Sequence, residues 1–412
     1  MSGKVFITEI GVLSPIGNSW KDFEQNMFAG RSGISAIRGK AVDPNFPVGH
    51  AGLVDDSKLP SNEQLGLPTD QLTNSLRFSL LSAMQCLEKV SGRFPIDSVV
   101  YGTAGGVFFE MVADSFNSLH PETFQWDRTR SEFGIEKLNE AIQAKQNKPI
   151  EKKNLVSMNS ACASGNHAVG LAYQRVKAGE WDRCLVTVVD AGAWQSQIMN
   201  FHLLQALNSQ DVSPDKASAP FSKNRAGFVK SEASASILIE SEKAAKERGA
   251  KPLAEVMGFG LTSDAYRITD GRDDGLCVAK AMELAVQTAG LKLDQIDYIN
   301  AHGTSTPLND RVETMSIKKL FGERAYKIPV SSLKSQVGHS TVAAGGLETI
   351  ACVSMLLHQR LAPTINFDEA DPDCDLDYVP NQSRPAKLKY VLSNNLGFGG
   401  QNASLVFGKA DS

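Results

Sequence analysis

The most informative segment of the chain is Val156-Ser157-Met158-Asn159-Ser160-Ala161-Cys162-Ala163-Ser164-Gly165-Asn166-His167-Ala168-Val169-Gly170. It predicts the end of an apolar strand, a tight turn of small residues, a cysteine and then a helix. The first turns of this helix carry almost no side-chain bulk, so another stretch of backbone can approach closely. Unpaired N–H groups and the helix dipole would lower the pKa of the Cys162 thiol at such a helix N-terminus. Cys162 is therefore a candidate nucleophile.

A free cysteine is also commonly an inert packing residue, and this segment alone favours neither interpretation. Two histidines further along favour catalysis. His302 follows the apolar run 296–301 and precedes Gly303, and His339 stands in a Gly-His turn before a second helix of small residues. Chemistry in α/β proteins collects at such strand ends. A thiolate can accept an acyl group from a thioester, and imidazoles beside it can stabilise an enolate.

Composition excludes several other classes of protein. The 412 residues carry a net charge of −4, with 42% hydrophobic and 21% charged residues, as in a globular protein. A nucleic-acid partner would need a basic surface, and no apolar run approaches the roughly 18 residues of a membrane span, so neither partner is expected. There is no signal peptide, and the six cysteines form no CxxC pair, which suggests a reducing, cytoplasmic location.

A metal site built from Cys162, His302 and His339 is conceivable. Nothing in the sequence supplies a fourth ligand, and the ligands lack the close spacing typical of cytosolic zinc sites. We therefore expect no metal and no cofactor.

Strands alternate with helices along the chain, which predicts an α/β fold. The same order occurs twice: a strand with a Gly/Thr turn into a helix, then a strand with a reactive residue before a helix of small residues. This predicts two similar halves, 1–250 with Cys162 and 251–412 with His302 and His339. Helices are expected at 20–28, 72–87, 132–145, 164–178, 242–247, 277–289 and 343–358. Strands are expected at 4–12, 98–101, 184–189, 233–239, 253–260, 296–301, 328–332, 390–395 and 403–407. Residues 38–68 are expected to be loop, and 114–154 a surface excursion that holds the helix 132–145. The apolar face of the helix 72–87 is expected at Leu72, Leu76, Leu80, Met84 and Leu87.

The chain resembles the β-ketoacyl-acyl-carrier-protein synthases of the elongating type, including the ketosynthase subunits of type II polyketide systems. The resemblance covers nearly the whole length, and the order and spacing of its motifs make it specific. It is carried by Ser14-Pro15-Ile16-Gly17, Ala161-Cys162-Ala163-Ser164-Gly165, Pro220-Phe221 with Arg225 and Gly227-Phe228-Val229, Ser263-Asp264-Ala265-Tyr266, Asn300-Ala301-His302-Gly303-Thr304-Ser305-Thr306-Pro307 with Asp310, Lys334-Ser335 with Gly338-His339, Ala343-Ala344-Gly345, and Gly397-Phe398-Gly399-Gly400 with Asn402.

The resemblance implies a thiolase-like fold of two similar halves in five α/β/α/β/α layers, and a dimer. It also implies the reaction. Cys162 would take an acyl chain from the phosphopantetheine thiol of an acyl-carrier protein. His302 and His339 would bind malonyl-carrier protein and stabilise the enolate formed as CO2 leaves. The product would be 3-oxoacyl-carrier protein, in fatty-acid or polyketide biosynthesis.

Further roles are implied residue by residue. The N–H groups of Cys162 and Phe398 would form an oxyanion hole, and Phe398 would gate the acyl pocket. Thr304 and Thr306 would hydrogen-bond the pantetheine arm. Lys334 and Glu348 would form a buried charged pair that holds the histidines, with Asp310 in support. The wall of the acyl tunnel is expected at Phe108 and Phe109.

The substrate and the partner stay open at this point. Departures from the usual pattern, above all bulky Phe108 and Phe109 at the tunnel wall, fit a polyketide or polyene ketosynthase at least as well as a fatty-acid enzyme. The chain could then work as a homodimer, or as a heterodimer with a chain-length-factor-like subunit. A catalytically silent scaffold that binds acyl-carrier protein is a further alternative. The presence of Cys162, His302, His339 and Lys334 argues against it.

Overall fold

The computed structural model describes residues 3–61, 73–90, 92–104, 132–146, 148–269 and 271–410. Ten strands in these ranges form one sheet with the order β10-β9-β13-β14-β8-β1-β7-β6-β4-β5. The order divides into two sets of five, β5-β4-β6-β7-β1 and β10-β9-β13-β14-β8. In each set the first three strands are parallel and the next two pair antiparallel. The strand sets therefore repeat one topology, as the sequence predicts.

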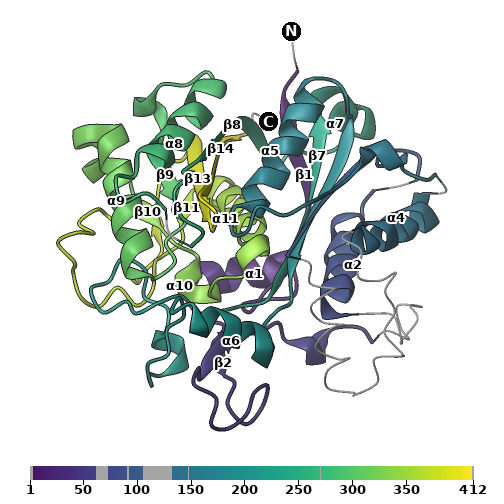
Figure 1. Ribbon diagram of the computed structural model, residues 1–412. Coiled ribbons are helices and arrows are strands. Elements are labelled where there is room, and N and C mark those ends of the chain that lie inside the picture. The colour runs from purple at the N-terminus through teal and green to yellow at the C-terminus, as the bar shows by residue number, and fades with distance from the viewer. Residues whose placement is uncertain are drawn as a thin grey trace.

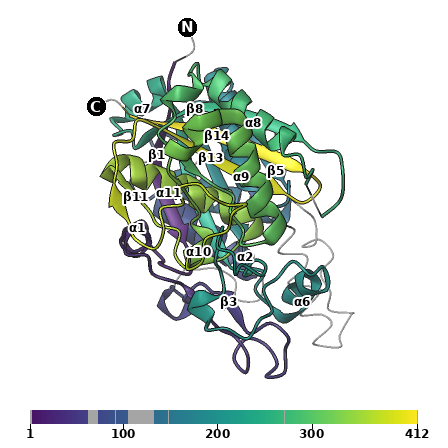
Figure 2. The same ribbon diagram turned by 90° about the vertical axis from the view of Figure 1, so that its left-hand side faces the viewer.

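The two sets of strands are joined by only a short stretch of pairing. Strands β1 and β8 pair through Phe6 with Glu255 and Ile7 with Ala254. Helices α5 and α11 lie between the two sets of strands and contact both of them and each other. Helices α2 and α4 cover the outer face of one set, and α8 and α9 cover the outer face of the other (Figures 1 and 2). This confirms the expected five layers. The domain boundary at 250/251 stays a prediction.

The first half holds the predicted nucleophile segment and its elements match the expected order. Helix α1 has the predicted bounds, because Ser19 caps its first turn by accepting a hydrogen bond from Asp22 N. Its elements are β1 (Val5–Leu13), α1 (Trp20–Phe28), β2 (Ile34–Ala36), β3 (His50–Gly52), α2 (Asn74–Cys86), β4 (Ser98–Thr103), α4 (Phe133–Gln146), β5 (Leu155–Met158), α5 (Ser164–Lys177), β6 (Arg183–Asp190), α6 (Gln195–Leu203), β7 (Ala233–Ser241) and α7 (Glu242–Arg248).

The second half repeats the strand order of the first. Its elements are β8 (Ala254–Ser263), α8 (Leu276–Thr288), β9 (Tyr298–Asn300), α9 (Pro307–Phe321), β10 (Val330–Ser331), α10 (Lys334–Val337), α11 (Ala344–His358), β11 (Arg360–Leu361), β12 (Arg384–Pro385), β13 (Tyr390–Gly397) and β14 (Gln401–Lys409).

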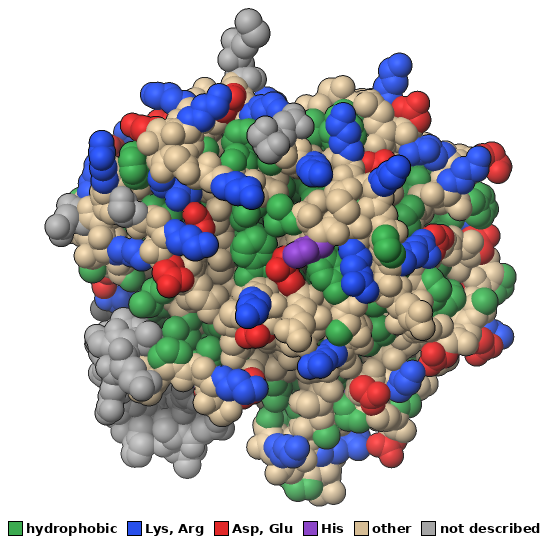
Figure 3. Space-filling view, turned by 180° about the vertical axis from the view of Figure 1, so that it is seen from behind, with side chains coloured by type: hydrophobic (Ala, Val, Ile, Leu, Met, Phe, Trp, Pro, Cys, Tyr) green, Lys and Arg blue, Asp and Glu red, His purple; other side chains and the backbone are tan. Residues whose placement is uncertain are grey.

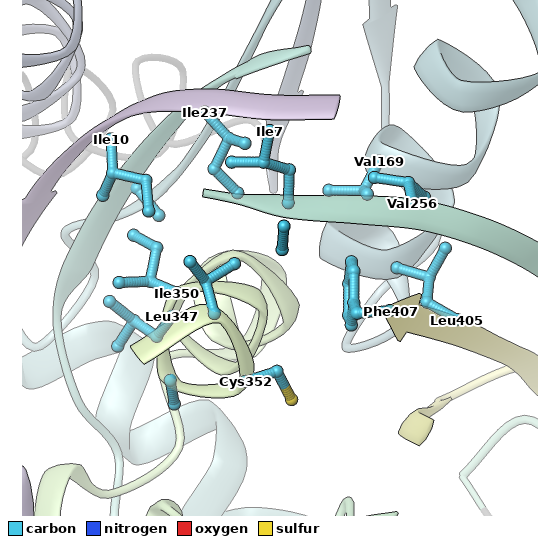
Figure 4. Close-up of a cluster of buried hydrophobic side chains, with 14 of the residues drawn as sticks. Ile7, Ile10, Val169, Ile237, Val256, Leu347, Ile350, Cys352, Leu405 and Phe407 are labelled. Carbon is cyan, nitrogen blue, oxygen red and sulfur yellow. The ribbon is translucent and has the colours of Figure 1, made fainter. Parts of the chain in front are cut away.

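The largest hydrophobic cluster joins the two halves. Figure 4 shows Leu347 and Ile350 of α11 below Ile10 and Ile237 of the first half. Val169 of α5 and Leu405, Phe407 and Val256 of the second half complete the cluster on the other side. Burial of this much aliphatic surface is the main force that fixes α5 and α11, and hence the residues at their N-termini.

Three local expectations were wrong. Residues 38–68 were expected to be loop, yet β3 pairs there with β2. Helix α4 was placed in a surface excursion, but Phe133, Ile135 and Leu138 are buried in a core cluster with α2. Met84 was counted on the apolar face of α2, and its side chain is 48% exposed.

One described helical stretch, Thr341–His358, is long and apolar enough to cross a membrane, which the search for apolar runs did not anticipate. Its window is 89% buried in the centre of the protein, as expected for a core helix. The surface is mixed in charge. Figure 3 shows the face seen from behind, where Lys and Arg side chains are spread out with Asp and Glu among them.

Candidate active site

Cys162 lies in a strained turn between β5 and α5. Ala161 has a left-handed backbone (φ +50°), and Ser164 Oγ donates to Ala161 O at 2.7 Å and accepts from Ser160 N at 2.7 Å. These bonds hold a conformation that costs about 1–3 kcal/mol for a residue with a side chain. Helix α5 begins only at Ser164, with Ala163 as its N-cap. Cys162 therefore precedes the helix by two residues and is not part of its first turn.

The small residues after Cys162 do allow close backbone packing, as predicted. A Cβ atom added to Gly165 would lie 2.5 Å from Gly345 Cα and 2.6 Å from Gly346 N of α11. A Cβ atom on Gly397 would lie 3.0 Å from Ala163 N. The end of β13 thus touches the cysteine turn directly.

His302 follows β9 by two residues, and its backbone is held by Glu313 of α9. The two carboxylate oxygens of Glu313 accept from His302 N and Gly303 N, both at 2.8 Å. Ser332 Oγ donates to Gly303 O at 2.7 Å. Gly303 has φ +37°, and a Cβ atom there would lie 2.6 Å from Ser332 Cβ, so only glycine fits.

Lys334 and Glu348 form the predicted buried ion pair, with side chains 2% and 1% exposed. Lys334 Nζ also donates to His302 O at 2.6 Å and lies 3.3 Å from His302 Nδ1. Asn395 donates to the second oxygen of Glu348. Because a buried ammonium is stable only with such partners, the network fixes the His302 ring.

His339 lies beside His302. Their ring centroids are 5.2 Å apart at an interplanar angle of 85°, and the Phe228 ring packs edge-on against His339 at 5.1 Å. His339 N donates to Val229 O at 2.7 Å. The buried Nδ1 atom of His339 has no hydrogen-bond partner among the described residues.

Burial sets the protonation states of the site. It lowers the pKa of His302 well below its usual value, and the Lys334 charge lowers it further. Burial, Lys334 and Lys230 likewise hold the pKa of His339 well below its usual value. Both rings are therefore neutral at pH 7 and can accept or share a proton.

The expected lowering of the Cys162 pKa is wrong in sign. Burial raises the pKa of the thiol to about 11, although Lys334, Lys230 and a backbone hydrogen bond from Phe398 oppose the rise. Burial removes the thiol from water, and water stabilises the thiolate form. Cys162 also lies before the first turn of α5, whose N–H groups would otherwise have offset this loss of hydration.

These groups open onto one cavity of about 330 Å³. Phe398, Thr304 and Thr306 line it together with Cys162 and both histidines, and the two threonine hydroxyls lie 2.8 Å apart. The centroid of the Phe398 ring lies 6.5 Å from that of the Phe201 ring. The cavity is also lined by Leu204, Gln205, Ala206, Phe228, Asp264, Thr269, Gly271, Val278, Pro307, Leu308, Asn309, Val312, Leu396, Gly397 and Asn402.

The remaining predicted residues lie elsewhere. Asp310 is fully buried, accepts from Phe221 N at 2.8 Å and faces Arg225 at 3.8 Å, so it supports the loop that backs His302. Phe108 and Phe109 lie outside the described residues.

Three residues of the site were missed. Glu313 could have been found, since it follows Asp310 by one helical turn on the same face of α9. Lys230 interrupts the apolar run Gly227-Phe228-Val229, and Asp190 ends the apolar strand β6. Each is a charged residue in an apolar context, which signals a buried partner.

The arrangement can perform nucleophilic acyl transfer. A thiol, two neutral imidazoles and the N–H of Phe398 converge on one cavity, which suits formation of a thioester and stabilisation of an adjacent anion. No three His, Cys, Asp or Glu side chains within the described ranges come together in a way that could hold a metal ion.

Comparisons with known proteins agree with this chemistry. Residues 154–245 match the model of the β-ketoacyl synthase N-terminal domain, and residues 253–368 match that of the C-terminal domain. A 3-oxoacyl-[acyl-carrier-protein] synthase 2 of Coxiella burnetii is 35% identical over 98% of both chains.

Two solved structures resemble the whole chain. One is a type II polyketide acyl-carrier protein in complex with its ketosynthase bound to the hexaketide, at 29% identity, 100% coverage of both chains and a TM-score of 0.87. The other is the ishigamide ketosynthase/chain length factor, at 29% identity, the same coverage and a TM-score of 0.86. The chain therefore belongs to the β-ketoacyl synthase family, as an acyl-transferring condensing enzyme of the 3-oxoacyl-[acyl-carrier-protein] synthase type.

Proposed function

We propose that Cys162, His302 and His339 carry out a decarboxylative Claisen condensation. In the first step the Cys162 sulfur attacks the carbonyl carbon of an acyl-carrier-protein thioester. The bond from that carbon to the pantetheine sulfur breaks, and the pantetheine thiol leaves with the proton that Cys162 gave up. The backbone N–H of Phe398 hydrogen-bonds the Cys162 sulfur. This group and the N–H of Cys162 would stabilise the oxyanion where its charge forms.

In the second step malonyl-carrier protein enters through the cavity, where Thr304 and Thr306 contact the pantetheine arm. The bond between the malonyl C2 and its carboxylate breaks, CO2 leaves, and the electron pair forms an enolate at the thioester oxygen. Neutral His302 and His339 donate hydrogen bonds to that oxygen. The enolate carbon attacks the acyl carbon on Cys162, and the Cys162 sulfur leaves as thiolate. The product is 3-oxoacyl-carrier protein.

The observation that carries this proposal is the convergence of three reactive groups from both halves of the chain. Cys162 comes from the first half, and His302 and His339 come from the second, yet all three line one cavity. Lys334 fixes the first histidine by direct contact. The presence of all three reactive residues argues against the alternative of a catalytically silent scaffold.

A second chain is expected at β5. Among the described strands β5 is the last one at its end of the sheet, and its four residues are all half-buried. Apolar Leu155, Val156 and Met158 at this end of the sheet suit pairing with a strand of another chain. We propose that a second chain of the same fold pairs there. It is a copy of this chain in a fatty-acid pathway, or a chain-length-factor-like subunit in a polyketide or polyene pathway.

The polyketide or polyene alternative is supported by the likeness over the full chain to a type II polyketide ketosynthase and to a ketosynthase/chain length factor. In both pathways the acyl substrates arrive on acyl-carrier protein, and no cofactor is needed. All six cysteines are free, which suits a reducing cytoplasm.

Intact-protein mass spectrometry tests the proposal. The protein is incubated with acyl-carrier proteins loaded with saturated chains of several lengths, alone and with a candidate partner subunit. We expect one acyl adduct, and none on Cys162→Ala. Cys277→Ala is the matched control, since Cys277 is the one cysteine that is not buried and should keep the adduct on Cys162. An adduct that persists on Cys162→Ala would contradict the assignment.

The same experiment separates the alternatives. Adducts from several saturated chains on the protein alone indicate a fatty-acid elongator. Adducts that require the partner subunit indicate a polyketide or polyene enzyme. Release of CO2 from malonyl-carrier protein by the wild type excludes a silent scaffold, which would release none.

A further inference from the structure

A second buried ion pair lies beside the site, and the proposed mechanism does not use it. Lys230 Nζ is 2.8 Å from Asp190 Oδ1, with side chains 0% and 3% exposed. Lys230 also donates to Ser231 O at 3.2 Å, and Gly192 N donates to Asp190 Oδ1 at 2.8 Å. An ion pair removed from water is costly to keep, because desolvation opposes both charges. Its position next to the reactive groups suggests a role beyond packing.

The pair is tied to the backbone that carries His339. Residues on both sides of Lys230 bond to His339: His339 N donates to Val229 O at 2.7 Å, and Ser231 N donates to His339 O at 3.1 Å. Lys230 and His339 thus stand opposite each other on two paired backbone segments. Movement of Lys230 would move the histidine.

Asp190 holds the other side of the same turn. The Thr341 hydroxyl donates to Asp190 Oδ2. Thr341 has φ +37°, a conformation that is strained for a β-branched residue and persists only when neighbouring contacts enforce it. Asp190 closes β6 of the first half, whereas Thr341 belongs to the second. The contact therefore clamps the His339 turn across the boundary between the halves.

The pair also contributes charge. The charged groups that act on the Cys162 thiol are Lys334, Lys230 and Asp190; the two lysines lower its pKa and Asp190 raises it. Lys334 reaches the site from the His302 side and Lys230 from the His339 side.

We propose that Lys230 and Asp190 are positioning residues of the condensing enzyme: the ion pair fixes the backbone segments that carry His339 and holds a second cation beside Cys162. The proposal rests on the proposed function for the role of His339, but the effect of the charges on the thiol is independent of any carrier protein.

Alkylation of Cys162 by iodoacetamide tests the charges. The thiolate displaces iodide and forms a carbon–sulfur bond, which intact mass follows at pH 7.5. We expect Lys230→Met to slow the reaction about threefold to tenfold and Asp190→Asn to speed it about threefold, because one pKa unit changes the thiolate fraction tenfold. The double variant should return to within about threefold of wild type, since both opposing charges are gone.

The decisive result is that the two single substitutions change the alkylation rate in opposite directions. Damage to the fold would shift both single variants in the same direction, and that outcome, or no change in either, would overturn the proposal. Lys230→Met leaves a buried carboxylate without a partner and can fail to fold. In that case the alkylation rate of the double variant is compared with that of Asp190→Asn, because these two proteins differ only in the Lys230 charge.

Decarboxylation of malonyl-carrier protein tests the clamp. Thr341→Val removes the hydroxyl that reaches Asp190, and Thr341→Ser keeps it. We expect kcat to fall about tenfold in Thr341→Val with KM unchanged, and to stay within about threefold in Thr341→Ser, as for loss of a preorganised group. Equal losses in both variants would contradict the clamp. A wild type that alkylates as predicted but releases no CO2 would instead refute the proposed function.

Discussion

At the scale of single residues, the main question is how a buried thiol becomes a nucleophile. With a pKa of about 11, Cys162 is almost entirely protonated at neutral pH. The thiol proton must therefore leave as the acyl group is attacked. His302 and His339 are both neutral and line the same cavity as the thiol, so the site holds proton acceptors where they are needed. The same burial that raises the pKa of the thiol thus also keeps the imidazoles neutral, so that they can accept its proton.

The first prediction concerns this thiol. The rate of Cys162 alkylation by iodoacetamide should rise about tenfold per pH unit from pH 7.5 to 9.5, because the thiolate fraction is far from saturation in this range. The rate is measured by intact mass, with Cys162→Ser as the background control. A plateau reached by pH 8 would mean a much lower pKa than the structure gives.

The second prediction concerns His339 and stability. Its pKa is about 6.5 in the unfolded chain and well below that when folded, so below pH 6.5 the unfolded chain binds a proton that the folded chain does not. The free energy of unfolding therefore decreases as the pH is lowered below 6.5, by up to about 1.4 kcal/mol per pH unit for this group. His339→Gln should make the decline between pH 7 and 5 less steep in urea unfolding. Parallel curves for the variant and wild type would contradict this.

The reactive residues could be found from sequence, whereas their pKa values could not. Cys162, His302 and His339 each stand among small residues at the end of a strand, a pattern visible in the sequence. The sign of the thiol shift depends on how deeply the turn is buried and on where α5 begins, and both depend on tertiary packing. Lys230 was missed for the same reason, since its partner Asp190 is 40 residues away.

At the scale of elements, the closest contact in the centre is the crossing of α5 and α11. The third prediction is that Gly165→Ala destabilises the protein by about 3 kcal/mol, because its Cβ atom would lie 2.5 Å from a backbone atom that cannot move aside. Thermal unfolding measures the effect. Gly179→Ala is the control: it has no atom within 4 Å, and its left-handed backbone should cost only about 1 kcal/mol. Equal losses would mean that the helices can separate.

Elements with strong local signals were predicted well. Helix α1 begins after a capping serine, and α7 ends at Gly249, which adopts φ +69°. Helix α6 was missed, because Ile198 is its only buried residue and its sequence lacks an apolar stripe. Strands β2 and β3 were missed as well. They have three residues each. Ala51 of β3 packs in a side cluster with Ile198 of α6, and Ile34 of β2 packs with Ala217 and Val229; no local pattern reveals either contact.

At the scale of the whole molecule, the site exists only when both halves are in place. Cys162 depends on α5 of the first half, and both histidines depend on loops of the second, while one hydrophobic cluster joins the two. The repeated topology explains why each half presents a strand-end residue toward the same centre. The order of motifs in the sequence predicted this arrangement, but the brief pairing of β1 with β8 could not be foreseen.

The last prediction concerns assembly. Strand β5 is the last described strand at its end of the sheet and runs directly into the Cys162 turn, so a second chain paired there would also fix the nucleophile. A charge at the half-buried Val156 should therefore weaken both assembly and acyl transfer. We expect Val156→Asp to shift the protein, or its complex with a partner subunit, from dimer to monomer in analytical ultracentrifugation, and to lower the rate of Cys162 acylation at least about tenfold, in line with the loss of a well-oriented group. Leu357→Asp, at an apolar position of 41% exposure in α11, is the control and should leave both unchanged. A Val156→Asp protein that stays dimeric and is acylated at the wild-type rate would place the interface elsewhere and separate catalysis from assembly.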